Sequence, residues 1–116
     1  IYLPVSAPFH CSLMKPAAEK MNNNILETNL NIPNIKIVSN VTAEATKNPD
    51  EIKKLLIEQI YSKVRWRESI EYMVNNGVKE FIEIGPGKVL SGLVKRTNDK
   101  VLSKSLNTID EIKNLK

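Results

Sequence analysis

The stretch Lys79-Glu-Phe-Ile-Glu-Ile-Gly-Pro-Gly-Lys-Val-Leu-Ser-Gly-Leu-Val94 predicts a strand, a glycine turn and a helix in direct succession. Its first part, Lys79 to Ile84, alternates and is rich in Ile and Phe, which is typical of a strand. Gly85-Pro-Gly87 follows as a tight turn. The helix after it should turn these residues inward: Val89, Leu90, Leu93 and Val94. Val101 to Leu106 is a further short strand, so strands alternate with helices and an α/β layered fold is expected.

The Gly-Pro-Gly turn is similar to a phosphate-binding loop in its strand–turn–helix context. It nevertheless lacks both the GxxxxGK[ST] and the GxGxxG patterns. A turn that needs glycine for its backbone is therefore the better interpretation. Lys88, Lys95 and Arg96 fall on the outer face of the following helix. They form either an ordinary solvated face or a surface for an acidic partner.

A strand end, a helix and a second strand are expected in the first part of the chain. Ile1 to Val5 is a short apolar run. Ser12 is a candidate N-cap of a helix that holds Pro16 in its first turn. Ile35 to Val38 is interpreted as a short buried strand. The apolar residues at helical spacing define one buried stripe: Met14, Ala17, Ala18, Met21 and Ile25.

A helix start is expected at Asn48-Pro-Asp-Glu51, with Asn as the cap, Pro at the first position and acids in the first turn. This helix should run to about Tyr61. Gln59 is the next position on its apolar stripe after Ile52, Leu55 and Leu56. A Gln there either serves a site or lies half-solvated at the helix end, since burying an unpaired amide costs about 1–3 kcal/mol.

The remaining elements are two helices. The first has four apolar residues on one face and Gly77 as its C-terminal signal. The second is an amphipathic tail from Thr108 to Lys116. The shared face of the first helix consists of Trp66, Ile70, Met73 and Val74.

His10 is the only histidine of the 116 residues and lies in the proline-punctuated stretch Val5-Ser-Ala-Pro-Phe-His-Cys-Ser-Leu-Met14. An unperturbed imidazole titrates near pH 6.5, so this side chain suits proton transfer near neutral pH. Its place just before a helix start is one where catalytic side chains often lie. The alternative is a hydrogen-bonded histidine with a structural role.

Composition excludes several classes of function. The chain carries a net charge of +4, 41% hydrophobic and 26% charged residues, which is typical of a globular protein. No apolar run reaches membrane-span length. One Cys and one His exclude an ordinary zinc site. The sequence also lacks the basic stripe with stacking residues that would indicate nucleic-acid binding. We expect no membrane or nucleic-acid partner, no metal, no tightly held cofactor and a cytoplasmic location.

Four motifs occur in the same order as in malonyl-CoA:acyl carrier protein transacylases, and the resemblance covers nearly the whole chain. They are Ser6-Ala-Pro-Phe-His-Cys-Ser-Leu-Met-Lys-Pro-Ala-Ala18, Ser39-Asn-Val41, Glu58-Gln-Ile-Tyr-Ser-Lys-Val-Arg-Trp66 and Glu83-Ile-Gly-Pro-Gly-Lys-Val-Leu90. The resemblance implies the C-terminal portion of an α/β-hydrolase-like large subdomain. Residues 1–116 would be a single partial acyltransferase domain, without the nucleophile half and most or all of a small ferredoxin-like subdomain.

The same resemblance implies a Ser-His acyl-enzyme mechanism that moves malonyl from malonyl-CoA to the phosphopantetheine thiol of acyl carrier protein in fatty acid biosynthesis. His10 matches the catalytic base, and Gln59 matches the residue whose main-chain carbonyl accepts the imidazole N–H. Asn40 matches a position lining the site. Phe9 matches a residue that goes with malonyl rather than methylmalonyl. The basic trio of Lys88, Lys95 and Arg96 could dock the acidic carrier.

The chain also departs from the family pattern. It contains no G-x-S-x-G elbow, and neither the arginine for the malonyl carboxylate nor the oxyanion-hole Gln has a match; Arg65, Arg67 and Arg96 do not correspond. Cys11 is no substitute nucleophile, because neighbouring side chains in an extended turn point apart. We expect this stretch alone to be inactive and marginally stable. The alternatives are a polyketide-type acyltransferase domain, an acyl hydrolase, or a non-catalytic α/β interaction module that binds an acidic partner.

Overall fold

The computed structural model describes residues 7–115, whose contacts separate them into two compact units. The first unit ends at Ser69 and the second begins at Ile70. The strand end expected at Ile1 to Val5 lies outside the described residues. No helix in the described part of the chain is long and apolar enough to cross a membrane.

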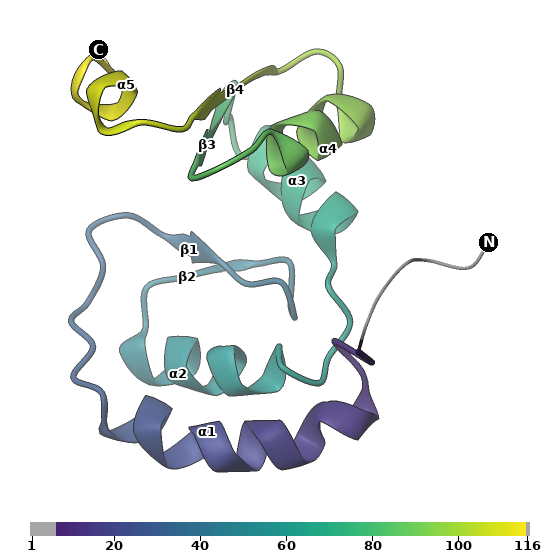
Figure 1. The fold of residues 1–116 in the computed structure, drawn as a ribbon, viewed down its shortest axis with the longest axis vertical. Coiled ribbons are helices and arrows are strands. Elements are labelled where there is room, and N and C mark those ends of the chain that lie inside the picture. The colour runs from purple at the N-terminus through teal and green to yellow at the C-terminus, as the bar shows by residue number, and fades with distance from the viewer. Residues whose placement is uncertain (1–6, 116) are drawn as a thin grey trace. The chain divides into compact units, whose positions relative to one another are not determined.

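Two helices and a hairpin make up the first unit (Figure 1). A short 3₁₀ turn, η1 (Ser12–Met14), leads into α1 (Lys15–Glu27). Strands β1 (Ile37–Val38) and β2 (Ala45–Thr46) pair antiparallel, and α2 (Pro49–Glu58) follows. Helix α2 lies between the hairpin and α1, and the two helices run in opposite directions (Figure 1). The start of α1 therefore lies beside the end of α2.

The start of α1 differs from the expectation. Ser12 does not cap this helix, because η1 takes up Ser12–Met14 and Met14 becomes the N-cap without a side-chain hydrogen bond. Pro16 lies in the first turn, as expected. The expected stripe is buried only in part. Ala18 is buried, whereas Met21 is 45% exposed.

The start of α2 confirms the expected signal. The Asn48 side-chain carbonyl accepts hydrogen bonds from the N–H groups of Asp50 at 2.9 Å and Glu51 at 3.3 Å. Ile52 and Leu55 are buried, whereas Leu56 is exposed. The helix ends at Glu58 rather than near Tyr61, which leaves Gln59 as its half-buried C-cap.

The hairpin corrects the expected buried strand at Ile35 to Val38. Only Ile37 and Val38 are in strand conformation, and Ile35 is 82% exposed. Their partners, Ala45 and Thr46, were not expected as a strand. A two-residue strand produces too little alternation to be distinguished from loop in a sequence.

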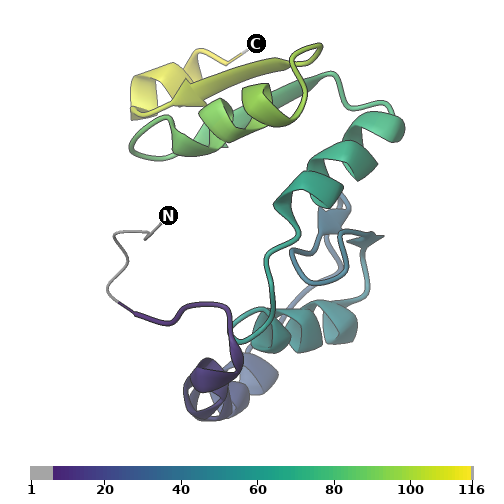
Figure 2. The same cartoon turned by 90° about the vertical axis from the view of Figure 1, so that its right-hand side faces the viewer.

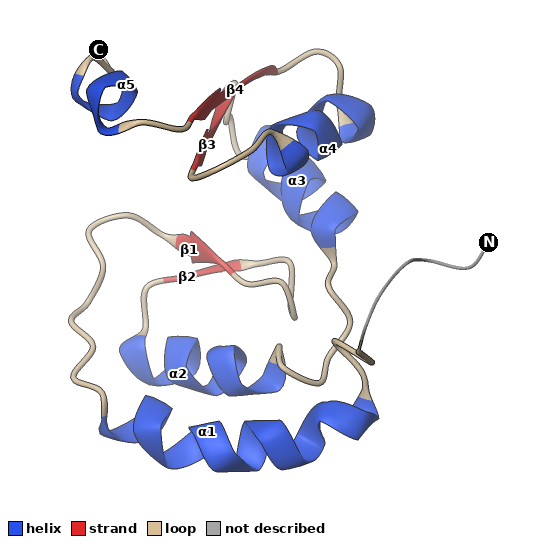
Figure 3. Cartoon of the chain, in the orientation of Figure 1, coloured by secondary structure: helices blue, strands red, loops and turns tan. Residues whose placement is uncertain are grey.

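The second unit holds a parallel pair of strands joined by a helix (Figures 2 and 3). Strand β3 (Glu80–Ile84) pairs with β4 (Leu102–Leu106) through the register Glu80↔Leu102 to Ile84↔Leu106, and α4 (Val89–Thr97) connects them. This is the predicted strand–turn–helix–strand order. The short helix α5 (Ile109–Lys113) follows, and Thr108 and Glu111 begin it with a capping box.

Helix α3 (Trp66–Asn75) spans the boundary between the units and ends where Gly77 was expected to stop it. Gly77 has φ +91°, its N–H donates to the Val74 carbonyl, and the Val78 N–H donates to the Met73 carbonyl. These two bonds form a Schellman motif, which needs a left-handed residue. Ile70 on the expected inner face is only 1% exposed.

Helix α4 buries less of its apolar stripe than expected. Val94 is buried and Leu93 half-buried, but Val89 is 68% exposed and Leu90 is also exposed. Both exposed residues lie in the first turn. A sheet of two strands offers the helix too little surface to cover both ends of its stripe.

The carboxylate of Glu83, on β3, caps the start of α4. It accepts hydrogen bonds from the N–H groups of Ser91 at 2.8 Å and Leu90 at 3.1 Å, where Lys88 makes no cap of its own. The Gly87 N–H donates to the Asn107 side chain at 2.8 Å. The donors that a phosphate-binding loop would offer are thus engaged, which supports the structural interpretation of the Gly-Pro-Gly turn.

We predict that this cap makes the second unit sensitive to acid. The hydrogen bond from the Ser91 N–H, assisted by that from Leu90, lowers the pKa of Glu83 from its ordinary value of 4.5 against the opposing effect of desolvation. A lowered folded-state pKa stabilises the fold above pH 4.5, and this contribution is lost as the pH falls through the folded-state value. The amide proton shifts of Leu90 and Ser91 should titrate with a midpoint below 4.5.

Glu83→Gln should lower Tm at pH 7 and weaken the dependence of Tm on pH below 4.5. Thermal melts followed by circular dichroism between pH 3 and 7 measure both. Glu19→Gln removes an exposed carboxylate from α1 and controls for net charge. Equal acid sensitivity in the two variants would show that the cap does not carry the effect.

Candidate active site

His10 lies in the turn just before η1 with its backbone in the left-handed region, at φ +57°. The conformation is uncommon for a residue other than glycine, and backbone strain of this kind clusters at functional sites. The turn is held by the Phe9 N–H, which donates to the Ala7 carbonyl at 3.0 Å. The His10 side chain is exposed, so one face of the imidazole is accessible.

The imidazole of His10 contacts the end of α2. Its Nδ1 lies 2.7 Å from the main-chain carbonyl oxygen of Gln59. A carbonyl can only accept, so Nδ1 carries the proton in this hydrogen bond. Nε2 of the neutral ring then has a free lone pair. Two segments 49 residues apart meet here because α1 and α2 are antiparallel.

The Gln59 carbonyl is available because α2 ends just before it. The last carbonyls of a helix lack intrahelical partners and lie at the negative end of the helix dipole. Beyond Glu58 the chain tightens into a turn, in which the Ile60 N–H donates to Ile57 and the Tyr61 N–H to Glu58. The Gln59 carbonyl is therefore hydrogen-bonded to His10 and not to a later N–H of the same helix.

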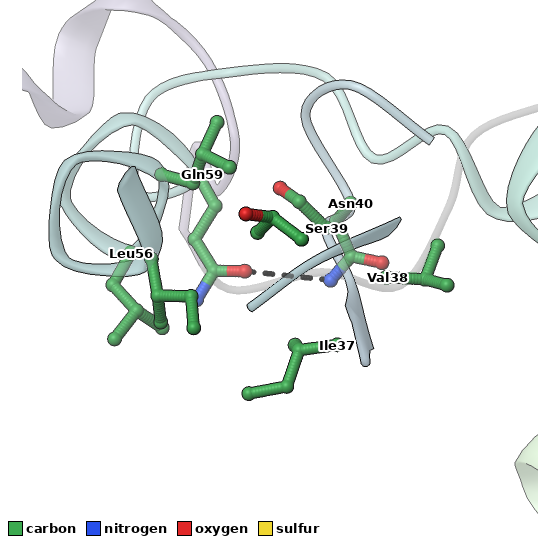
Figure 4. Close-up of a pocket in the computed structure, with 9 residues that line it drawn as sticks. Ile37, Val38, Ser39, Asn40, Leu56 and Gln59 are labelled. Atoms are coloured by element: carbon green, nitrogen blue, oxygen red, sulfur yellow. Dashed lines mark hydrogen bonds between the residues drawn. The ribbon is translucent and has the colours of Figure 1, made fainter. Parts of the chain in front are cut away.

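The side chain of Gln59 faces a third element, the β1–β2 loop. The Asn40 amide nitrogen lies 3.4 Å from the Gln59 side-chain oxygen (Figure 4). The pair lies at a cavity of about 90 Å³ between the hairpin and α2. Its lining is mostly apolar and includes Ile37, Val38 and Leu56. Three of the residues singled out by resemblance, His10, Gln59 and Asn40, are thus connected.

Phe9 precedes His10 and is 60% exposed. Cys11 follows His10, and its thiol donates to the Pro8 carbonyl at 3.1 Å. This contact directs the thiol to its own turn. Among the described residues, no group of three or more His, Cys, Asp or Glu side chains could hold a metal ion.

The basic trio lies in the second unit. Lys88 is the N-cap of α4, and Lys95 and Arg96 lie in its last turn. All are exposed. By helical rise, the two ends are about 10 Å apart, so the trio is a spread surface and not a tight anion pocket.

Arg65 is a residue whose role the sequence did not reveal. Its main-chain N–H donates to the Asn40 carbonyl at 2.9 Å, and its guanidinium Nη1 donates to the Thr42 carbonyl at 2.8 Å. It thereby fixes the loop that carries Asn40. The sequence offered one signal, its place in the motif that ends at Trp66, but a contact with loop carbonyls leaves no pattern in residue types.

The fold is similar to part of solved acyl carrier protein malonyltransferases. A crystal structure of an acyl carrier protein S-malonyltransferase from Vibrio cholerae matches 98% of this chain with a TM-score of 0.88 and 44% identity, over 37% of its own length. A chain in a solved complex of a type II polyketide synthase acyl-carrier protein with its malonyl-transacylase matches 95% of this chain with a TM-score of 0.85 and 36% identity, over 36% of the matched chain's own length.

The chain is homologous to malonyl-CoA:acyl carrier protein transacylases. It is 45% identical over 105 residues to the Escherichia coli K12 enzyme, which covers 90% of this chain and 34% of that enzyme. The chain thus spans about a third of the length of the relatives it matches. No family model matches it. The matched portion is mixed α/β, as the order of strands and helices in the sequence predicted.

We predict that neutral His10 is predominantly the Nδ1–H tautomer, because the Gln59 carbonyl 2.7 Å away can only accept. The ¹⁵N shifts of the His10 ring in the full-length protein, assigned by their loss in His10→Ala, measure the tautomer. A dominant Nε2–H tautomer would contradict the contact.

Proposed function

We propose that this chain is the C-terminal portion of the α/β-hydrolase-like large subdomain of a malonyl-CoA:acyl carrier protein transacylase. The protein that carries it would transfer malonyl from malonyl-CoA to the phosphopantetheine thiol of acyl carrier protein in fatty acid biosynthesis. The observation that carries the proposal is the contact between His10 Nδ1 and the Gln59 main-chain carbonyl, in a chain homologous to such enzymes.

In the proposed mechanism, the nucleophile is a serine outside this chain. His10 Nε2 accepts the serine hydroxyl proton while the oxygen attacks the malonyl thioester carbonyl. The tetrahedral intermediate collapses, its C–S bond breaks, and the imidazolium returns the proton to the departing coenzyme A thiol. The carrier thiol then gives its proton to Nε2 and attacks the ester, and the serine oxygen leaves as it regains that proton.

The Gln59 carbonyl replaces the carboxylate of a Ser-His-Asp triad in this mechanism. It fixes the tautomer that leaves Nε2 free. The end of α2 also places negative partial charge near a ring that becomes positive during each proton transfer. Because a carbonyl carries no net charge, the site needs no buried ion to orient its base.

The acyl group is proposed to bind beside Phe9. The exposed ring next to His10 could fill the space that an α-methyl group needs, which would favour malonyl over methylmalonyl. Coenzyme A and phosphopantetheine enter as substrate carriers.

Substitutions in the full-length protein should separate the roles of His10 and Gln59. His10→Ala should lower kcat/KM for malonyl transfer by about 10²- to 10⁴-fold, because it removes the general base. Gln59→Ala should cost less than about tenfold, since the main-chain carbonyl remains. Stopped-flow or radiolabel transfer from malonyl-CoA to the carrier measures both.

Equal and mild losses for the two variants would overturn the proposed mechanism and favour a non-catalytic interaction module. A parent protein in which water outcompetes the carrier thiol would instead be an acyl hydrolase. A polyketide-type acyltransferase is the second candidate, which the similarity to the polyketide malonyl-transacylase complex supports. Transfer to polyketide rather than fatty acid carriers, measured side by side, distinguishes it.

A second prediction concerns carrier docking. Reversing the α4 charges should raise KM for acyl carrier protein roughly tenfold at low salt and leave kcat unchanged, and added salt should diminish the difference. The substitutions are Lys88→Glu, Lys95→Glu and Arg96→Glu. The control reverses three exposed lysines of the first unit: Lys20, Lys36 and Lys63. The same KM in both triple variants would show that α4 does not dock the carrier.

A further inference from the structure

We propose that Asn40 is a positioning residue for the base, acting through Gln59, and that Arg65 holds the loop from which it acts. The inference rests on the proposed function, because it deepens the role of the contact between His10 and Gln59. Neither residue needs to touch substrate for this role. The argument has three structural steps.

The first step is that the Gln59 carbonyl requires a fixed direction. It follows the last residue of α2, and the next N–H groups donate to Ile57 and Glu58 instead. The Ile60 N–H belongs to the same peptide as the Gln59 carbonyl, and its hydrogen bond to the Ile57 carbonyl is 3.3 Å long, so the local backbone holds this peptide only weakly. A small rotation there would carry the oxygen out of range of Nδ1, since a hydrogen bond weakens steeply when its angle falls.

The second step is the amide pair. The Asn40 nitrogen lies 3.4 Å from the Gln59 side-chain oxygen, and Figure 4 shows the two amides facing each other beside the cavity. The Gln59 side chain and carbonyl branch from the same Cα. With the side chain held by Asn40, the carbonyl has fewer directions available.

The third step is the anchorage of Asn40. The main-chain N–H of Arg65 donates to the Asn40 carbonyl at 2.9 Å, and the Arg65 guanidinium donates to the Thr42 carbonyl at 2.8 Å. Within the same loop, Ala43 is buried at φ +57° and its N–H donates to the Ser39 carbonyl at 2.9 Å. Arg65 thus holds the loop at two carbonyls, and the loop presents Asn40 to Gln59.

Asn40→Ala in the full-length protein should lower kcat about 3- to 10-fold, because it removes one hydrogen bond. The KM for malonyl-CoA should stay unchanged. The double variant with Gln59→Ala should be no slower than the worse single variant, because both remove the same contact. In the same full-length protein, Asn40→Ala should lower the Nδ1–H fraction of neutral His10 in ¹⁵N spectra. Arg65→Lys, which shortens the reach to Thr42, should move kcat in the same direction.

Asn76→Ala is the matched control. It removes the same amide, whose nitrogen donates to the Tyr72 carbonyl at 2.8 Å at the end of α3, and should leave kcat and the tautomer unchanged. A raised KM with unchanged kcat would make Asn40 a substrate contact and overturn the inference. So would additive losses with an unaltered tautomer, or no loss at all.

His10→Ala distinguishes the two levels of the argument. If it abolishes transfer while Asn40→Ala has no effect, the positioning role fails and the proposed function stands. If His10→Ala leaves transfer intact, the proposed function itself fails.

Discussion

The hydrogen bond between His10 Nδ1 and the Gln59 carbonyl depends on where a helix ends. Had α2 continued through Lys63, the Lys63 N–H would have donated to the Gln59 carbonyl, because a helical carbonyl accepts from the residue four positions farther along the chain. It ends at Glu58 instead, and the freed carbonyl accepts from a side chain 49 residues away. The antiparallel packing of α1 on α2 is the other requirement, because it brings the start of one helix to the end of the other.

Each of the two units satisfies a helix end from elsewhere in the chain, with different consequences. In the second unit the Glu83 carboxylate takes the free N–H groups at the start of α4, and in doing so closes a potential anion site. In the first unit the imidazole of His10 takes a free carbonyl at the end of α2 and retains an unused nitrogen. The same constraint, that helix ends need partners, therefore gives a closed structural cap in one unit and an exposed imidazole with a fixed hydrogen bond in the other.

Signals that act through neighbouring residues could be predicted from the sequence. Asn48 with Pro49 starts a helix, and Gly77 ends one, because caps and left-handed turns are local requirements. The strand–helix–strand order of the second unit also followed from local periodicity. What periodicity cannot supply is the surface that covers a stripe. Met21 and Val89 share faces with buried residues yet are exposed, since burial depends on what packs opposite.

The site divides along the same line. The residue types and motif order around His10 and Gln59 were sufficient to predict both as site residues, because a lone imidazole and a Gln on an apolar stripe are conspicuous. Arg65 was not found, since its partners are the main-chain carbonyls of Asn40 and Thr42, which every residue type presents equally. A site oriented by carbonyls is therefore only partly predictable from a sequence, because main-chain acceptors are known only when the fold fixes where each backbone segment turns. The carbonyl that accepts from His10 and the carbonyls that accept from Arg65 are all main-chain groups, so the geometry of this candidate site depends on backbone positions more than on the identity of the residues that provide them.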